Sequence, residues 1–454
     1  MRPLQRLAAT IAPVTFFSAR HIRHLKALAA RWRRRALFLL GGVAVGAVAV
    51  LLTLLADKAQ LAFHQLLQQW RYASLVVTPA GFGLAVYLTL RFFPNSQGSG
   101  IPQAIAAREL EDYGQRRALV SIRIAIGKIL VTLLGLLCGA SAGREGPTVQ
   151  VGASIMFALG RLSPRRQPGL ILAGAAAGVA AAFNTPLAGI VFGIEELSRA
   201  FELRTSGLVI GAVIAAGLTA TALVGDYSYF GHTSDMLHTA TEWLAVPVCG
   251  VVGGLMGGVF SRILVLLAGG LPGRIGGWIK QQPIPFAVLC GFGVALCGMA
   301  SGDTTFGTGY EQIKSVLDDG TSLPWSFGLL KLAATTLTSI SGIPGGIFSP
   351  SLAIGGGIGL NLGAIFTSVP VGVMILLGMV AYFAGVVQAP ITAFVIVTEM
   401  TDNHAMMVPL MATALIASSA SRLICPEGVY HALAKNFVKQ AQSASSHQSE
   451  RPPV

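Results

Sequence analysis

Charged residues are scarce in this sequence of 454 residues: they make up 11% of it, against about 25% in a typical soluble domain. So few charges cannot cover the surfaces of the two or three soluble domains that the length would allow. Hydrophobic residues make up 53%, which excludes a disordered chain. The composition therefore indicates an integral membrane protein.

Cysteine and histidine are also rare, and their positions do not suit a disulfide, a metal site or a catalytic site. The five cysteines show no CxxC or zinc spacing and are interpreted as packing residues, so no disulfide, metal or cofactor is predicted. No GxxxxGK[ST] motif is present, which argues against ATP as the energy source. A membrane enzyme such as a serine protease needs a histidine at membrane depth. The eight histidines lie mostly at the ends and links of apolar segments, which makes an enzyme the weaker alternative: His21, His24, His64, His232, His238, His404, His431 and His447.

Acidic residues are absent from the segment 1–35, which holds nine of the basic residues. By the positive-inside rule this segment is cytoplasmic and can lie on anionic lipid. The basic residues stop at an apolar run, 36–55, that is long enough to span a bilayer, which argues against a cleaved signal peptide and against nucleic-acid binding. Two further arginine clusters mark links predicted to be cytoplasmic: Arg161, Arg165 and Arg166, and Arg199 and Arg204.

Long apolar segments recur along the rest of the chain. They are too long to be strands of a membrane barrel, and their apolar and polar residues do not alternate as in such strands. They are therefore predicted to be helices. Many are interrupted by Gly or Pro, which is tolerated in a membrane where the backbone lines a cavity. The segments are 36–55, 72–90, 119–140, 168–195, 207–224, 244–269, 284–300, 326–341, 368–400 and 405–423.

An internal repeat divides the chain into a first membrane repeat, 36–224, and a second, 244–438. The linker between them, 225–243, lacks Lys and Arg and is predicted to face outward, and the polar tail 439–454 is predicted to be disordered. Duplicated halves with matching broken helices are typical of transporters whose site lies between the repeats. Pairs at offsets of 203 or 204 residues define the repeat: Lys128 with Lys331, Glu145 with Phe348, Pro147 with Pro350, Pro186 with Pro390, and Glu195 with Glu399.

Three glycine-rich breaks, GSGIP (98–102), GREGP (143–147) and GIFSP (346–350), each place a proline near the start of an apolar segment. Proline suits the first turn of a helix, so each break presents a helix N-terminus whose free N–H groups favour an anion. A single break would be better explained as a packing kink. Three of them, two at repeat-related positions, predict an anion path built from backbone amides.

Five charged side chains in or beside the apolar segments are candidates for chemistry. Glu145 begins a helix and is predicted to be a gate and proton carrier; the alternative is a capping carboxylate paired with Arg144. Glu195 and Glu196 end an apolar run, where one loads protons from the cytoplasm or both form a solvated helix end. Lys128, like Lys331, either extends to the membrane interface or raises the local positive potential.

These motifs together resemble those of the CLC family of chloride channels and proton-coupled chloride transporters. The resemblance covers about residues 36 to 438 and includes a tyrosine in PEGVYHALAKNF. It implies an all-α integral membrane fold with two inverted-topology repeats of many tilted and broken helices. It also implies a homodimer with a separate anion path in each subunit.

The resemblance assigns roles by position. Ser99 and Tyr430 supply hydroxyl groups to the central anion, and the backbone N–H groups of Ile347 and Phe348 complete that site. Glu145 matches the external gate and proton acceptor, with amides around Arg144 and Gly146 forming the outer site. Glu196 matches the internal proton acceptor, and Lys128 a buried basic residue of bacterial members.

Particular residues indicate the subclass. Ser99 is typical of chloride-selective members, and the presence of both Glu145 and Glu196 is typical of a bacterial inner-membrane antiporter. The transported ligands are then chloride and protons, and the alternative is a passive voltage- or pH-gated chloride channel of the same fold. One departure from the bacterial pattern follows GSGIP, where Gln103 and Ile105 stand at positions that carry acids in some antiporters.

Overall fold

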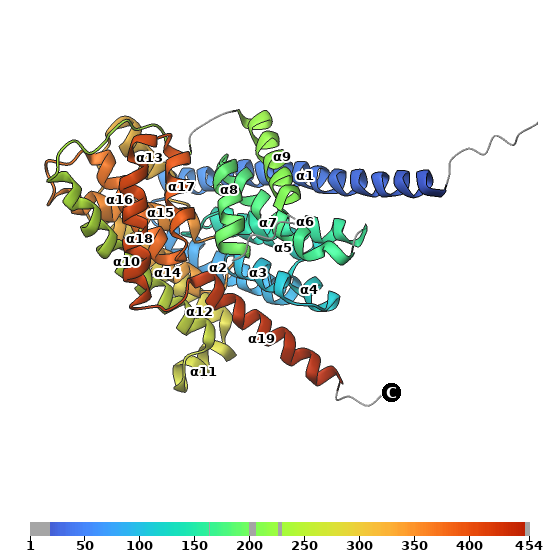
Figure 1. Cartoon of the computed structure of the whole chain (residues 1–454). Coiled ribbons are helices and arrows are strands. Elements are labelled where there is room, and N and C mark those ends of the chain that lie inside the picture. The colour runs from blue at the N-terminus through green and yellow to red at the C-terminus, as the bar shows by residue number, and fades with distance from the viewer. Residues whose placement is uncertain (1–18, 163, 199–205, 226–228, 450–454) are drawn as a thin grey trace, which may run out of the picture.

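The computed structural model describes residues 19–162, 164–198, 206–225 and 229–449, and within these ranges the regular structure is helical (Figure 1). The helices of the first half are α1 (Ala19–Gln69), α2 (Ser74–Phe92), α3 (Ile101–Glu109), α4 (Tyr113–Leu119), α5 (Ile122–Leu137), α6 (Glu145–Leu159), α7 (Gln167–Phe183), α8 (Pro186–Phe192) and α9 (Ser206–Val224). Those of the second half are α10 (Ala245–Gly269), α11 (Gly273–Gln281), α12 (Pro283–Ala300), α13 (Tyr310–Asp319), α14 (Phe327–Ile340), α15 (Phe348–Gly363), α16 (Val371–Val387), α17 (Pro390–Thr401), α18 (Met407–Arg422) and α19 (Val429–Ser449). Short turns complete the set: η1 (Gly160–Leu162), η2 (Pro164–Arg166), η3 (Gly193–Ser198, a π-helix), η4 (Glu242–Leu244) and η5 (His404–Met406).

The helices fit a membrane by length and composition. Among the described residues, seven are long and apolar enough to cross a bilayer, and several shorter apolar helices lie between them. The predicted all-helical membrane fold is therefore confirmed.

Packing follows the internal repeat. Helix α6 packs on α7 as α15 packs on α16, and α1 packs along α9 as α10 packs along α18. The halves also join each other directly, because α2 packs on α12 and α8 on α17. The repeat detected in the sequence thus corresponds to two halves with matching helix order and packing.

Two long apolar segments each contain two helices. The segment 168–195 turns at Asn184, which has a φ of 57°, and the segment 368–400 turns at Gln388, with a φ of 59°. A left-handed residue of this kind ends a helix, and the proline two residues later begins the next one, at Pro186 and Pro390. The short helices α8 and α17 that result are the repeat-related pair at the junction of the halves.

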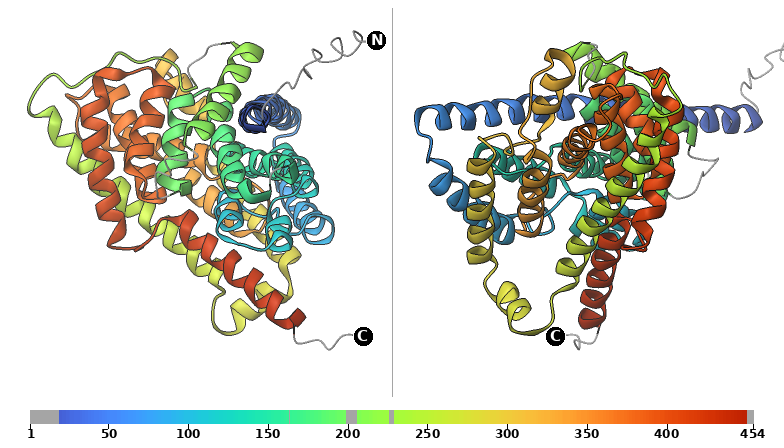
Figure 2. Two further views of the ribbon diagram at one scale, coloured as in Figure 1. Left: turned by 45° about the vertical axis from the view of Figure 1, so that its right-hand side comes forward. Right: turned by 90° about the vertical axis from the view of Figure 1, so that its left-hand side faces the viewer.

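The chain ends differ from the predicted division. From Ala19 onward, the described part of the basic segment and the first apolar run form one continuous helix, α1, whose first turns project beyond the other helices (Figures 1 and 2). Helix α19 continues through Ser449, so the prediction of a disordered tail from 439 is wrong over most of that tail. The tail is polar but has no Gly or Pro before Pro452, so the sequence holds no helix-breaking residue up to Ser449. Arg199, Arg204 and residues 1–18 and 450–454 lie outside the described residues.

Candidate anion and proton site

The three glycine-rich breaks meet in space through backbone hydrogen bonds. Gly143 and Gly346 each donate an N–H to the carbonyl of the other, both at 2.7 Å. The N–H of Gly98 donates to the Ile343 carbonyl at 3.1 Å, and the N–H of Gly345 donates to the Gly98 carbonyl at 3.0 Å. The structure therefore brings together segments that lie some 200 residues apart in the sequence, as the motif analysis predicted.

Each break contains the first residue of a helix. Helix α3 begins at Ile101, α6 at Glu145 and α15 at Phe348, so the free N–H groups of three helices lie in one region. Glycine is required where the loops touch. Gly100 has a φ of 100°, and a Cβ at Gly146 would lie 2.4 Å from the Ser99 Oγ. The amide N–H of Gly146 and the hydroxyl of Ser99 are thereby held side by side.

Polar side-chain atoms in this region are buried without a hydrogen-bond partner. They are the Ser99 Oγ, the Tyr430 Oη and the Glu145 Oε2. Tyr430 is the second residue of α19 and is fully buried, and Ser99 is 8% exposed. A buried hydroxyl with no partner is costly, so these atoms mark a place where a polar ligand would be bound.

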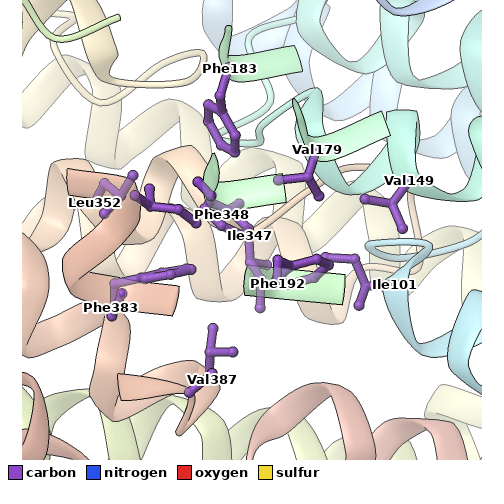
Figure 3. Packing of buried hydrophobic residues seen from close by; sticks show 14 of the residues in the cluster. Ile101, Val149, Val179, Phe183, Phe192, Ile347, Phe348, Leu352, Phe383 and Val387 are labelled. Atoms are coloured by element: carbon purple, nitrogen blue, oxygen red, sulfur yellow. The ribbon is translucent and has the colours of Figure 1, made fainter. Parts of the chain in front are cut away.

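The walls of the region are apolar. Ile347 and Phe348 are buried, and the Phe348 ring lies 4.2 Å from that of Phe383 and 4.8 Å from that of Phe183, between ring centroids. Figure 3 shows Phe348 between these two rings, with Ile347 beside Phe192. The backbone N–H groups at the start of α15 therefore lie in a surrounding of low polarity, where their attraction for an anion is strong.

The Glu145 carboxylate is fully buried and does not pair with Arg144. Its Oε1 accepts a hydrogen bond from the Tyr229 Oη at 3.1 Å. The Arg144 guanidinium instead pairs with Asp57 of α1 and donates to the Thr53 carbonyl at 3.1 Å. The alternative of a capping carboxylate neutralised by Arg144 is thus wrong, because Arg144 faces α1. Arg144 is the residue that precedes α6, so its backbone, and not its guanidinium, lies beside the start of that helix.

Tyr229 was not identified from the sequence. It lies in the linker predicted to face outward, yet it is 1% exposed, and its ring packs on Tyr310 with centroids 4.9 Å apart. Its hydroxyl also lies 3.4 Å from the Ser349 Oγ, in the first turn of α15. The first part of the linker thus reaches the Glu145 carboxylate. A tyrosine in a polar link gives no periodic signal that could have revealed this.

The two glutamates of the EE pair have different surroundings. Glu195 accepts hydrogen bonds from the N–H groups of Ile391 (3.1 Å) and Thr392 (2.6 Å), at the start of α17. Glu196 is 3% exposed, and the Nε2 of His431 lies 2.7 Å from its backbone carbonyl oxygen. The carboxylates therefore do not form a solvated helix end: one is bound to α17 and the other is buried beside α19.

Glu399 repeats the arrangement of Glu195 in the other half. Its carboxylate accepts hydrogen bonds from the N–H groups of Leu187 (3.1 Å) and Ala188 (2.7 Å), in the first turn of α8. Glu195 follows the end of α8 by three residues, and Glu399 lies in the last turn of α17. Each short helix is thus associated with a glutamate that binds the N-terminus of the other. A carboxylate at a helix N-terminus is stabilising. We call Glu195, Glu399 and these four N–H groups the reciprocal clamp.

The two repeat-related lysines are fully buried, so the idea that they extend to the membrane interface is wrong. The Lys128 Nζ donates to the carbonyls of Ser96 (2.8 Å) and Gly98 (2.5 Å), in the loop before α3. The Lys331 Nζ donates to the carbonyls of Thr305 (2.8 Å) and Gly307 (2.7 Å), in the loop before α13. Each ammonium group therefore fixes the loop that leads into a helix.

A cavity of about 360 Å³ leads to Ser99 and Ile347 from one side of the molecule. Its lining includes Gln103, Phe437 and Lys280, from α3, α19 and α11. Gln103 is buried and donates through its Nε2 to the carbonyls of Gln97 (2.7 Å) and Asn95 (3.3 Å). This side chain thus holds the GSGIP loop, where an acidic residue could not donate these bonds.

Comparisons with known proteins agree with this geometry. The family model described as voltage gated chloride channel matches residues 80–422. The H(+)/Cl(-) exchange transporter ClcA of Yersinia pseudotuberculosis serotype IB (strain PB1/+) is 31% identical over 411 residues, which cover 84% of this chain and 83% of the relative. The protein of the same name from Yersinia pestis bv. Antiqua (strain Angola) is 32% identical over 410 residues, with the same coverage.

Solved structures share the fold. A slow cyanobacterial Cl−/H+ antiporter superimposes with a TM-score of 0.78 at 24% identity, over 90% of this chain and 98% of that one. A CLC-type fluoride/proton antiporter gives a TM-score of 0.75 at 22% identity, over 92% of this chain and 99% of that one. From its motifs, its fold and these relatives, the chain is a member of the CLC family of chloride channels and transporters.

Proposed function

We propose that this protein exchanges chloride for protons across a membrane. The observation that carries the proposal is the position of Glu145, whose buried carboxylate begins α6 beside the unpartnered hydroxyls of Ser99 and Tyr430. A carboxylate and an anion can each use the amides and hydroxyls of this region. Relatives about a third identical to this chain carry the name of H(+)/Cl(-) exchange transporters.

The mechanism is a competition for one site. Ionised Glu145 occupies the amide-lined region, with its Oε1 held by Tyr229. An anion that arrives displaces the carboxylate, and the displaced carboxylate takes up a proton, because an isolated charge in a poorly solvated place is costly. Binding of chloride and binding of a proton thereby become linked, as exchange requires.

The hydroxyls and amides suit a transported anion. Ser99, Tyr430 and the N–H groups of Ile347, Phe348, Arg144 and Gly146 carry no net charge, so they bind chloride without holding it too tightly to leave. The nearest fixed cation of the GSGIP loop, Lys128, is bound to carbonyl groups. It raises the local potential without itself forming the site.

Glu196 is proposed as the proton acceptor on the inner side. It lies on η3, is buried, and contacts α19 through His431, the residue that follows Tyr430. The remaining features of the proposal are a homodimer, the bacterial inner membrane, a cytoplasmic N-terminus and contact with membrane lipid. They are supported by the family and by the basic residues before position 36.

Transport in liposomes tests the proposal. The purified protein is reconstituted with a chloride gradient, the voltage is set with a potassium ionophore, and proton movement is recorded. Chloride flow that drives protons against their own gradient supports exchange. Chloride flow without proton movement would make the protein a passive channel of the same fold, and no chloride flow would contradict an anion transporter altogether.

A further inference from the structure

A buried histidine lies against the inner glutamate. His431 is the residue after Tyr430 and is 8% exposed. Its Nε2 lies 2.7 Å from the Glu196 carbonyl oxygen and 3.6 Å from the Glu196 Oε1. One ring nitrogen therefore lies near both the backbone carbonyl oxygen and a carboxylate oxygen of the same glutamate.

We propose that His431 is a proton-relay residue that passes protons to and from Glu196, an inference that rests on the proposed proton exchange. In the step, the Nε2–H bond of the imidazolium breaks and an O–H bond forms on the Glu196 Oε1. The products are a neutral imidazole and a neutral carboxylic acid, and the reverse step restores the ion pair. No electron is transferred and no other reactant is needed.

The hydrogen bond to the carbonyl places the proton. A carbonyl oxygen only accepts, so the Nε2 of His431 must carry a hydrogen whenever this bond exists. That hydrogen is then the one closest to the Glu196 carboxylate. The separation of 3.6 Å is less than about 1 Å longer than a hydrogen bond, and rotation of a side chain covers such a distance.

Other charges near the pair support both protonation states. Arg108 of α3 donates to the carbonyls of Leu197 (2.9 Å) and Ser198 (3.2 Å), directly after Glu196, and favours the ionised carboxylate. The ionised carboxylate in turn favours the protonated ring. The described residues on α19, on the loop before it and on the elements packed against it or against η3 include these titratable or charged side chains: Arg108, Glu109, Glu195, Cys249, Arg262, Tyr382, Glu399, Cys425, Glu427, Tyr430, Lys435 and Lys439.

A second histidine–carboxylate pair in this chain serves as a matched control. The His404 Nε2 lies 3.6 Å from the Asp402 Oδ1, the same separation as in the buried pair. The His404 and Asp402 side chains are 72% and 63% exposed, whereas those of His431 and Glu196 are 9% and 4% exposed. The two pairs thus differ mainly in burial and in position relative to the anion site.

The transport test uses H431Q, H431A and H404Q in liposomes with the internal pH varied. In the unaltered protein, proton flux rises as the internal pH falls and the His431 ring gains a proton. H431Q loses this rise, and its proton flux falls at least about tenfold, while H404Q matches the unaltered protein. Because Gln can still donate to the Glu196 carbonyl, a purely anchoring role predicts that H431Q behaves normally and only H431A fails. That outcome would overturn the proposal.

A second measurement does not depend on transport. The His431 ring is titrated by NMR in the detergent-solubilised full chain, with and without E196Q. Loss of the carboxylate lowers the midpoint of the ring titration by about one pH unit or more, and an unchanged midpoint would overturn the pairing. If the unaltered protein moved chloride but no protons, the proposed exchange would fail, and this titration would still decide whether the two groups interact.

Discussion

The two halves of the molecule share a design but differ at the residue that begins the broken helix. Helix α6 begins with Glu145, and α15, its counterpart 203 residues later, begins with Phe348. Both positions are fully buried. The first half therefore places a titratable group at its helix N-terminus, and the second places an apolar ring that encloses the same region. Under the proposed exchange, the difference teaches that duplication supplies the anion site, and that one substituted position supplies the coupling to protons.

The largest expected effect comes from removing that difference. In E145Q the neutral amide no longer competes with chloride as a charge, so proton transport falls by at least about 100-fold while chloride flux continues. The matched variant F348L keeps the backbone N–H groups of α15 and keeps proton coupling. Both fluxes are recorded in the same liposomes. Loss of chloride binding in E145Q would show instead that Glu145 is a structural residue.

The reciprocal clamp gives the next comparison. Glu195 and Glu399 bind the two short helices in the same way, but only Glu195 adjoins Glu196. We expect E195Q to lower proton flux about tenfold by misplacing the neighbouring carboxylate, and E399Q to leave the proton-to-chloride ratio unchanged. Thermal unfolding in detergent serves as the control, since both variants weaken a similar pair of bonds. Equal effects of the two variants on the ratio would argue against a positioning role.

The buried lysines allow a comparison of smaller effect. Lys128 fixes the loop that carries Ser99, and Lys331 fixes the related loop before α13. K128M therefore weakens chloride binding about fivefold, or about 1 kcal/mol, whereas K331M has little effect on binding. Both variants leave buried carbonyls unpaired and lose stability by about 1–3 kcal/mol. Calorimetric titration with chloride measures the binding, and an equal loss of affinity in both variants would contradict the assignment.

Tyr229 is expected to have the smallest effect. Its hydroxyl donates to the Glu145 carboxylate in the first half. The related position in the second half is Phe348, which has no carboxylate. Y229F loses one hydrogen bond to a charged group, so the carboxylate leaves the site more readily. Chloride binding tightens about threefold, the result of about 0.7 kcal/mol. Weaker binding in Y229F would show that Tyr229 binds the anion rather than the carboxylate.

Much of the fold and the family could be predicted from sequence. Scarce charge, long apolar segments and Gly-Pro breaks indicate a helical membrane protein whatever the tertiary packing. The prediction of a transport protein rather than an enzyme is confirmed by the family and its exchange-transporter relatives. The breaks around Ser99, Glu145 and Phe348 were placed correctly in one region because glycine and proline mark helix starts by local rules.

The remaining features depend on contacts between distant parts of the chain. Lys128 and Lys331 begin apolar segments in a way that suits the membrane interface, and only the fold shows that loop carbonyls bind them. The separation of Glu195 from Glu196 requires the position of α17. His431 and Tyr229 have no local pattern, because the residues that give them a role lie 235 and 84 positions away. Titratable groups outside regular apolar patterns are therefore the ones that sequence alone did not reveal.

Proton uptake on chloride binding tests the competition at Glu145 most directly. Chloride is added to the purified protein in weakly buffered detergent solution, and the pH change is recorded. The account predicts that protons are taken up as chloride binds, because the displaced carboxylate becomes protonated, and that E145Q binds chloride with no uptake. Chloride binding without proton uptake in the unaltered protein would contradict a shared site for the carboxylate and the anion.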